Sequence, residues 1–315
     1  MPIQLLTGPR RARSWHSGAR LDLLDVTVCA ADTRTPGLAA RALEICMDQC
    51  NFGDAILFSN TPVEGRFRNI AIPDFTSIHD YSLFCLRGMS GHIATDFALV
   101  VQWDGYIVDR SAWTNRFRRY DYIGALLPRP PGSPIVGNGG FSWRSRRLLQ
   151  ALLELPLVPD QNEDVVISGL LRPALETDFD VRFAPPALAQ RFSHESEGPA
   201  RSTFGFHGMY NLLRYEDDDT IAAMITALPG ASRVARAFFS LLVSSVRNGR
   251  TELANSLYTA VRGDHEPEWL ATQMARWRSA EIAHATIAAL EAAHLSRAGR
   301  RGGVADKPAS LGSRR

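Results

Sequence analysis

The sequence predicts an α/β fold in which a mostly parallel sheet is flanked by helices and followed by a small all-helical C-terminal region. Two observations predict it. Between residues 21 and 102, short and continuously apolar segments alternate with segments of helical periodicity, as in sheets that are covered on both faces. Beyond residue 216, apolar residues recur only at helical spacing. The length of 315 residues allows about two domains.

The elements of the first region follow one another in a regular order. The apolar segment 21–30 predicts a strand that ends in a polar turn, and Pro36 then opens a helix whose apolar residues recur at helical spacing. Further strands are predicted at 54–59, 68–73 and 97–102, with a second helix around Tyr81 to Met89.

The second region predicts a small helical bundle. The i, i+3, i+4, i+7 spacing of an amphipathic helix links Ile221, Met224, Ile225 and Leu228, and similar periods continue to residue 297. The aperiodic basic start and the Gly-, Arg- and Ser-rich end predict tails. The expected organisation is a flexible basic tail at 1–20, an α/β domain at 21–215, a helical domain at 216–297 and a disordered tail at 298–315.

Composition argues against several classes of protein. Hydrophobic residues make up 45% of the chain and charged residues 22%, as in soluble globular proteins, and the formal net charge of +2 argues against a nucleic acid partner. No apolar stretch approaches the ~18 residues of a transmembrane helix, and the N-terminus lacks the apolar core of a secretory signal, so a cytoplasmic protein is expected. Four cysteines are expected to be free thiols in a reducing compartment, with a redox or metal role as the alternative: Cys29, Cys46, Cys50 and Cys85.

Polar residues follow two of the predicted strands at their carboxyl ends, where open α/β sheets bind ligands. Asp32-Thr33-Arg34 follows the first strand, and Gln102-Trp103-Asp104-Gly105 follows the strand at 97–102. A carboxylate at Asp104 can hold a divalent metal that in turn binds a diphosphate. The alternative is a plain Asp-Gly turn after a strand.

A glycine-rich segment, Gly137-Asn138-Gly139-Gly140, predicts a loop that allows positive φ and a close approach of the backbone to a ligand. Ser142 could then cap a helix that carries Arg144, and the N-terminus of such a helix would favour an anion. The alternative is an ordinary tight loop.

Two adjacent carboxylates, Glu163 and Asp164, come shortly after Asp160. Asp160 with Glu163 three residues later fits a capping box at a helix start. The functional alternative is that one of the adjacent carboxylates faces a cleft as a general base.

Histidines in three contexts are candidates for metal binding or acid–base chemistry. His207 lies between glycines and aromatic residues in Phe204-Gly205-Phe206-His207-Gly208. His194, next to Glu195, is a second candidate, and His79 is a third. The alternative for each is a histidine that is simply packed in a loop.

Taken in order, these clusters resemble an uncharacterised bacterial family of glycosyltransferases with the GT-A (nucleotide-diphospho-sugar transferase) fold, over residues 24–215. The matching segments are Val101-Gln102-Trp103-Asp104-Gly105, Tyr120-Asp121-Tyr122-Ile123-Gly124-Ala125, Gly137-Asn138-Gly139-Gly140-Phe141-Ser142, Glu163-Asp164, Arg191-Phe192-Ser193-His194-Glu195 and Phe204-Gly205-Phe206-His207-Gly208.

The resemblance implies roles for these residues. It implies that Asp104 and His207 hold Mn²⁺ or Mg²⁺ on the donor diphosphate, and that Asp164 acts as the catalytic base, with Glu163 left to the helix cap or to acceptor binding. It further implies that donor-binding residues include Asp32, Thr33, Arg34, Gly137, Asn138, Gly139 and Gly140. The usual metal motif has two acidic residues separated by one, whereas Gln102-Trp103-Asp104 offers a single carboxylate.

The leading hypothesis is transfer of a sugar from a nucleotide-diphosphate donor to a hydroxyl of a carbohydrate or glycoconjugate acceptor, in bacterial surface-polysaccharide or glycoconjugate synthesis. With Asp164 as a base, inversion is favoured over retention. One alternative is a degenerate transferase domain that acts as a nucleotide- or carbohydrate-binding module, with the C-terminal helices binding a protein partner. Another is a nucleotidyl or sugar-phosphate transferase, which would need a Gly/Lys phosphate loop that Asp32-Thr33-Arg34 lacks.

Overall fold

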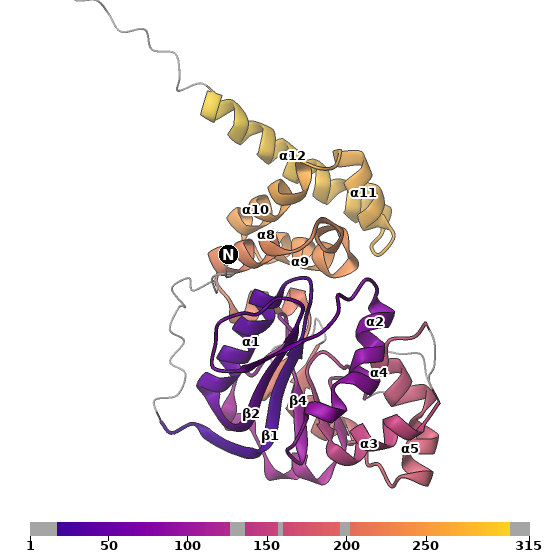
Figure 1. Ribbon diagram of the computed structural model, residues 1–315. Coiled ribbons are helices and arrows are strands. Elements are labelled where there is room, and N and C mark those ends of the chain that lie inside the picture. The colour runs from indigo at the N-terminus through magenta and orange to yellow at the C-terminus, as the bar shows by residue number, and fades with distance from the viewer. Residues whose placement is uncertain (1–17, 127–135, 157–159, 196–201, 303–315) are drawn as a thin grey trace, which may run out of the picture. The chain divides into compact units, whose positions relative to one another are not determined.

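A computed structural model of the protein describes residues 18–126, 136–156, 160–195 and 202–302. The chain packs as two compact units, Met1–Asp217 and Asp218–Arg315. The first unit contains the sheet and the second is helical (Figure 1). The predicted N-terminal tail falls mostly on residues 1–17, outside the described residues.

A six-stranded sheet of order β3-β2-β1-β4-β6-β5 forms the centre of the first unit. Strands β1 to β4 are parallel, whereas β6 runs antiparallel to both β4 and β5. The predicted mostly parallel α/β fold is confirmed, and β1 to β4 correspond to the four predicted strands. The strands are β1 (Leu21–Ala31), β2 (Cys50–Ser59), β3 (Arg68–Ala71), β4 (Phe97–Val100), β5 (Tyr122–Ile123) and β6 (Ser142–Ser145).

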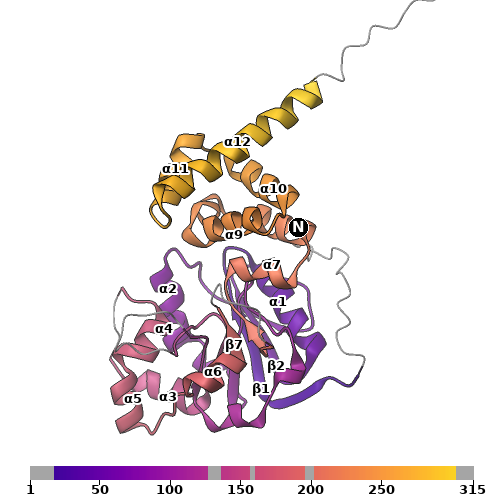
Figure 2. The same ribbon diagram turned by 180° about the vertical axis from the view of Figure 1, so that it is seen from behind.

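Helices lie on both sides of this sheet (Figures 1 and 2). The helix α1 (Pro36–Gln49) packs on β1 and β2. A separate core cluster joins Cys29 and Val100 of the strands to Leu149 of α3 (Arg146–Glu154). Because successive strand residues point to opposite faces, burial of both faces explains why β1, β2 and β4 are continuously apolar rather than alternating.

The other helices of the first unit are short. Two of them continue into a π-helical turn, Phe84–Gly88 after α2 and Val166–Leu170 after α4. A second, two-stranded parallel sheet pairs β7 (Ser193–His194) with β8 (Gly205–Phe206). The short helices are α2 (Ile78–Leu83), α4 (Glu163–Val165), α5 (Arg172–Asp178), α6 (Pro186–Phe192) and α7 (Leu212–Tyr215).

The second unit consists of helices whose apolar stripes are buried, Ile221, Met224 and Ile225 among them. The last helix continues to Gly302, five residues into the stretch predicted to be a disordered tail from Ala298, and residues 303–315 lie outside the described residues. No helix among the described residues is long and apolar enough to cross a membrane. The helices are α8 (Asp218–Ala227), α9 (Arg236–Arg247), α10 (Thr251–Arg262), α11 (Pro267–Ala275) and α12 (Ala280–Gly302).

The prediction that Ser142 caps a helix carrying Arg144 is wrong. Both residues lie in β6, where Ser142 pairs with Val100 of the neighbouring strand. The helix begins later, and its cap is Ser145, whose Oγ accepts a hydrogen bond from Leu148 N at 3.1 Å. The polar residues of β6 hid a strand that is buried along its whole length.

The four cysteines are free and buried, as predicted. Burial raises the pKa of Cys29, Cys46 and Cys85 to about 12. Since the thiolate is the reactive form, these side chains behave as small apolar groups.

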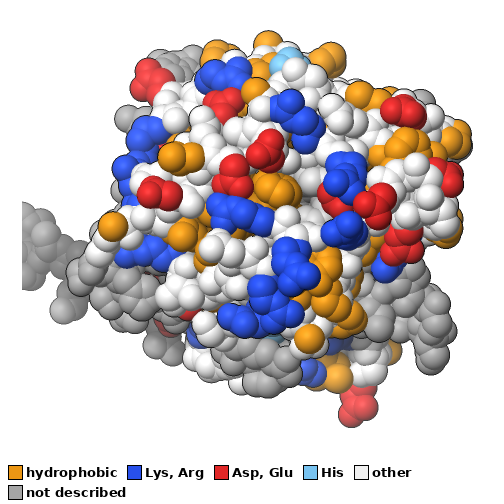
Figure 3. All heavy atoms as spheres, turned by 90° about the horizontal axis from the view of Figure 1, so that it is seen from below, with side chains coloured by type: hydrophobic (Ala, Val, Ile, Leu, Met, Phe, Trp, Pro, Cys, Tyr) orange, Lys and Arg blue, Asp and Glu red, His pale blue; other side chains and the backbone are white. Residues whose placement is uncertain are grey.

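Basic and acidic side chains are interspersed on the face shown in Figure 3. On the surface of the first unit, Arg118 donates two hydrogen bonds of 2.7 Å to the carboxylate of Asp25, and Arg147 donates one of 3.0 Å to Asp180. The Arg118–Asp25 pair is half-buried, whereas the Arg147–Asp180 pair is exposed. Exposed pairs contribute about 1 kcal/mol or less each. Their main effect is that each carboxylate offsets the charge of its arginine.

A chain that ends at Asp217 should unfold in one cooperative transition, and one that ends at Tyr215 should be less stable by about 3 kcal/mol. Only the shorter chain lacks Glu216, whose Oε1 accepts hydrogen bonds from Arg41 Nη2 at 2.8 Å and from the Tyr106 hydroxyl. Arg41 is 6% exposed, so losing its carboxylate leaves a buried charge unpaired. Urea denaturation of both chains measures the difference. Equal midpoints would refute the role of Glu216, and a non-cooperative longer chain would refute the modular boundary.

Candidate active site

A pocket of about 370 Å³ lies at the carboxyl ends of β1 and β4. Its walls include the apolar or aromatic residues Phe75, Tyr81 and Val101, and its polar lining includes Arg34 and Gln102. This is the edge of the sheet at which open α/β folds bind ligands.

The polar turn after β1 contributes to this pocket unequally. The carboxylate of Asp32 accepts hydrogen bonds of 2.7 Å from the backbone N–H of Arg34 and of Thr35, and one of 2.8 Å from Thr35 Oγ1. Thr33 Oγ1 accepts a hydrogen bond of 2.9 Å from Phe75 N. Asp32 and Thr33 therefore shape the turn before α1 and also line the pocket, and the exposed side chain of Arg34 lines it beside them.

The segment after β4 is a tight turn and also places a carboxylate. Gln102 and Gly105 exchange backbone hydrogen bonds of 3.1 and 2.9 Å, which leaves Trp103 and Asp104 at the tip. Asp104 is 8% exposed, and its Oδ1 lies 3.6 Å from His207 Nε2. Burial raises the pKa of Asp104, against the lowering effect of His207. The tight turn is therefore formed and holds the carboxylate beside His207, and the metal-binding role of Asp104 stays a prediction.

His207 is contacted on both ring nitrogens. Its Nε2 lies 3.0 Å from Gln102 Oε1, and its Nδ1 lies 3.0 Å from Asn138 Nδ2 and 3.3 Å from Glu195 Oε1. Burial lowers the pKa of His207, but the charges of Asp104 and Glu195 outweigh it and raise the pKa to about 9.

The small parallel sheet explains how residues distant in sequence meet here. Ser193 pairs with Gly205 and His194 with Phe206, and His207 N donates a hydrogen bond of 2.9 Å to His194 O. Glu195 and His207 are the next positions of this register, so their side chains lie beside each other. The signal in the sequence was the His194-Glu195 pair, whose carboxylate lies 3.3 Å from His207 Nδ1.

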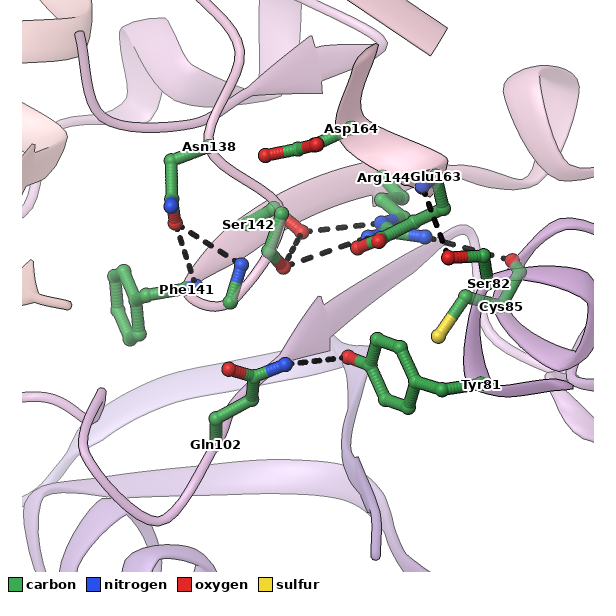
Figure 4. A network of polar contacts seen from close by, with 12 residues as sticks. Tyr81, Ser82, Cys85, Gln102, Asn138, Phe141, Ser142, Arg144, Glu163 and Asp164 are labelled. Carbon is green, nitrogen blue, oxygen red and sulfur yellow. Dashed lines mark hydrogen bonds and ion pairs between the residues drawn. The ribbon is translucent and has the colours of Figure 1, made fainter. Parts of the chain in front are cut away.

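The glycine loop packs directly against these side chains. A Cβ on Gly140 would lie 2.2 Å from His207 Nε2, and one on Gly139 would lie 2.1 Å from Glu163 Oε1. Asn138 Oδ1 accepts hydrogen bonds from Gly140 N at 3.0 Å and Phe141 N at 3.4 Å, which closes the loop (Figure 4). Neither glycine has a positive φ, so the loop needs glycine for close approach and the expectation of positive φ is wrong.

Glu163 and Asp164 point to different surroundings (Figure 4). Glu163 Oε1 accepts a hydrogen bond of 3.2 Å from Nη2 of Arg144, which is 0% exposed, and Arg144 Nη2 also lies 3.4 Å from Gly139 O. Asp164 extends away from this pair toward the side of Asn138. Its negative charge also raises the pKa of His207.

The capping box predicted at Asp160 and Glu163 is not formed. Asp160 has a φ of 56°, and the residue before the helix is Asn162, which makes no side-chain cap. Glu163 N instead donates to Ser82 Oγ at 3.2 Å. Glu163 therefore forms no capping box, its Oε1 is paired with Arg144, and its role in acceptor binding stays a prediction.

Two further polar residues connect the pocket with His207. Gln102 Nε2 donates a hydrogen bond of 2.6 Å to the Tyr81 hydroxyl (Figure 4). Gln102 Oε1 lies 3.0 Å from His207 Nε2. No pattern in the sequence indicated this link, since a glutamine stands where an acidic residue was expected. His79, the third histidine candidate, accepts a hydrogen bond of 3.3 Å from Asp160 N at its Nδ1.

The side chains around Asp104 and His207 provide only part of a binding site for a divalent metal. Within the described ranges, no group of three or more His, Cys, Asp or Glu side chains is arranged to hold a metal. Two atoms each bound ~2.0–2.2 Å from one ion lie ~3.0–3.6 Å apart at common coordination angles. Asp104 Oδ1 and His207 Nε2, 3.6 Å apart, fit that spacing. Since Mg²⁺ and Mn²⁺ sites commonly combine a few protein ligands with substrate phosphates, this pair suits a metal that arrives with a diphosphate.

Comparisons with known proteins give a match to an uncharacterised family and weak similarity to solved structures. The family described as a protein of unknown function (DUF5672) matches residues 65–207, which is less than half of the chain. No curated protein matches the sequence.

Solved structures similar to this one are glycosyltransferases. A mannosyltransferase from Pyrobaculum calidifontis, solved with GDP-mannose and Mn²⁺, is 12% identical, with 89% of this chain and 79% of that chain covered and a TM-score of 0.38. A glycosyltransferase involved in glycosylation of the major capsid of PBCV-1 is 13% identical, with 58% and 91% covered and a TM-score of 0.38. The galactosyltransferase LgtC, solved with donor and acceptor sugar analogues, is 10% identical, with 57% and 86% covered and a TM-score of 0.35. Structural similarity at these TM-scores and identities does not show that two proteins share a function.

We expect His207 to titrate near pH 9 in the metal-free protein and at lower pH in the Asp104→Asn variant, because that substitution removes the largest charge effect that raises its pKa. The folded pKa lies above the ordinary value of 6.5. The protonated ring therefore stabilises the fold fully below pH 6.5, and this contribution is lost as the pH rises through about 9. Histidine NMR titrations of both proteins measure the two pKa values. A His207 that titrates at or below pH 6.5 in the parent would contradict the geometry of the site.

Proposed function

We propose that the first unit is a glycosyltransferase that moves a sugar from a nucleotide-diphosphate donor to an acceptor hydroxyl. One observation carries the proposal: a pocket at the carboxyl end of the sheet shares Gln102 with a buried carboxylate–imidazole pair, Asp104 and His207. The order of the sequence motifs, from Gln102-Trp103-Asp104 to His207, supports the same reading through its resemblance to GT-A glycosyltransferases.

The nucleoside would occupy the pocket and the diphosphate would lie toward the pair. Phe75 and Tyr81 offer aromatic surface for a base, and Arg34 offers a cation at the pocket. A diphosphate that extends from the pocket past Gln102 would lie next to Asp104 and His207. This arrangement assigns binding of the donor to the carboxyl ends of β1 and β4.

Asp104 and His207 would hold Mn²⁺ or Mg²⁺ together with the donor diphosphate. When bound, the metal supplies positive charge that stabilises the departing diphosphate. The carboxylates of Asp104, Glu195 and Asp164 all act on His207, so the site carries an excess of negative charge that favours a divalent cation.

Asp164 is the proposed general base. As the acceptor oxygen bonds to the anomeric carbon, the hydroxyl proton passes to Asp164 and the bond from carbon to the diphosphate oxygen breaks, with its electron pair leaving on the diphosphate. This is an inverting displacement. Glu163 is excluded from the role of base because Arg144 holds its carboxylate.

The acceptor is proposed to be a carbohydrate or glycoconjugate, in a cytoplasmic step of bacterial surface-polysaccharide or glycoconjugate synthesis. Four buried free thiols are in keeping with a reducing compartment.

A degenerate, nucleotide- or carbohydrate-binding module is the second candidate. One observation favours it: Gln102 occupies the position of the first acidic residue in the usual metal motif. An amide is neutral, so it contributes no negative charge to a metal, and this one is also in contact with Tyr81 and His207.

A thermal-shift panel of nucleoside diphosphates, each with and without Mn²⁺, separates these functions. We expect a shift that requires both nucleotide and metal in the parent, and its loss in Asp104→Ala and in His207→Ala while the fold survives. A parent that shifts with nucleotide alone indicates the module. Variants that respond as the parent does would show that the metal assignment is wrong.

Asp164→Asn and Glu163→Gln form a matched pair that separates chemistry from structure. Asp164→Asn removes the base, so sugar transfer should fall by ~10²–10⁴-fold with donor binding kept. Glu163→Gln unpairs the buried Arg144, so it should lower the free energy of unfolding by ~3 kcal/mol. Transfer rates and urea denaturation of both variants give the comparison. If Asp164→Asn transfers sugar at a rate within a few-fold of the parent, Asp164 is not the general base.

A further inference from the structure

Glu195 lies beside the proposed metal ligand His207, and one of its two carboxylate oxygens has no hydrogen-bond partner among the described residues. Its Oε1 is 3.3 Å from His207 Nδ1, and its side chain is 18% exposed. Its Oε2 is buried and has no hydrogen-bond partner among the residues that the structure describes. The hydrogen-bond contact of this carboxylate is therefore with the imidazole, on Nδ1 rather than on the Nε2 that faces Asp104.

A second group competes for the same nitrogen. Asn138 Nδ2 lies 3.0 Å from His207 Nδ1. The orientation of this amide follows from its oxygen, which accepts from Gly140 N and Phe141 N, so the NH₂ group is the end that faces the ring. An NH₂ group can only donate, and it therefore favours a ring without hydrogen on Nδ1.

The outcome of this competition decides which nitrogen can bind a metal. If Asn138 donates to Nδ1, the neutral ring carries its hydrogen on Nε2 and donates it to Gln102 Oε1, 3.0 Å away. No lone pair then faces Asp104. If Nδ1 carries the hydrogen and donates it to Glu195, the Nε2 lone pair is available on the side of Asp104.

We infer that Glu195 is the positioning residue of this site: it accepts the Nδ1 hydrogen of His207 and so reserves Nε2 for a divalent metal. This inference rests on the proposed metal site of Asp104 and His207. A carboxylate behind a metal-binding histidine typically changes metal affinity by ~10–100-fold, because it fixes both the tautomer and the orientation of the ring.

Glu195→Leu and Glu195→Gln test the inference by Mn²⁺ titration of the full chain, with free Mn²⁺ measured by electron paramagnetic resonance. Leucine removes the acceptor and fills the buried space, whereas the amide oxygen of glutamine can still accept the Nδ1 hydrogen. We expect Glu195→Leu to weaken Mn²⁺ binding by ~10–100-fold and Glu195→Gln by only a few-fold. A second substitution, Asn138→Asp, replaces the competing NH₂ by an acceptor and keeps the oxygen that closes the loop. It should restore Mn²⁺ binding in Glu195→Leu to within a few-fold of the parent.

Each outcome decides the inference. Equal losses of Mn²⁺ affinity in Glu195→Leu and Glu195→Gln would mean that Glu195 acts through charge alone. Unchanged Mn²⁺ binding in Glu195→Leu would mean that Glu195 does not act on His207. Either result overturns the inference and leaves the proposed function standing. A parent that binds no Mn²⁺ overturns the metal site of the proposed function and this inference with it. If the thermal unfolding midpoint of Glu195→Leu is close to that of the parent, its weaker Mn²⁺ binding does not come from unfolding. If Glu195→Leu unfolds, Glu195→Gln is compared with the parent instead.

Discussion

The buried ion pair of Arg144 and Glu163 is the interaction on which the arrangement of the candidate site depends. Arg144 is fully buried in β6, and its guanidinium donates to Glu163 Oε1, to Gly139 O and to Ser142 Oγ. One side chain thus ties the sheet to the glycine loop and to the start of α4. A charge buried this deeply is tolerated only with a partner, and removing either member is expected to cost ~3–5 kcal/mol.

The geometry around His207 follows from that anchor. The loop fixed by Arg144 carries Asn138 and Gly140, and both lie against the imidazole. Gly140 leaves no room for a Cβ, so the ring can approach the loop backbone while Asp104 and Glu195 reach it from other segments. The result is one imidazole among several carboxylates, which raises its pKa and makes the site attractive to a cation.

Periodicity in the sequence was sufficient to predict β1, β2 and β4, because a strand buried on both faces has a continuous apolar run. It failed for β6, where buried Ser142 and Arg144 look like a polar helix start, since the charge is neutralised by a residue 19 positions away. The polar turn after β1 was predicted to bind the donor, yet Asp32 satisfies backbone N–H groups of its own turn. A strand end that is polar in sequence can therefore serve the fold as well as a ligand.

Long-range pairing accounts for what the sequence left open in the site. The nearness of Asp104 and His207 was implied by a family resemblance and by no spacing, because they are 103 positions apart in the sequence. Glu195 reaches His207 only through the β7–β8 register, and each of those strands is two residues long, too short to produce a period. Only the family resemblance distinguished the neighbouring carboxylates Glu163 and Asp164 in the sequence, and the contact of Arg144 with Glu163 adds a physical difference between them.

The most direct measurement is an assay of the full chain with a panel of nucleotide-diphosphate sugars, Mn²⁺ and candidate acceptor sugars, in which released nucleoside diphosphate is quantified for each donor. We expect one class of donor to be turned over and a chelator to abolish the turnover. The initial product should have the anomeric configuration opposite to that of the donor. A protein that binds nucleotide and metal at the pocket but releases no nucleoside diphosphate from any donor would contradict the claim that this site transfers sugars.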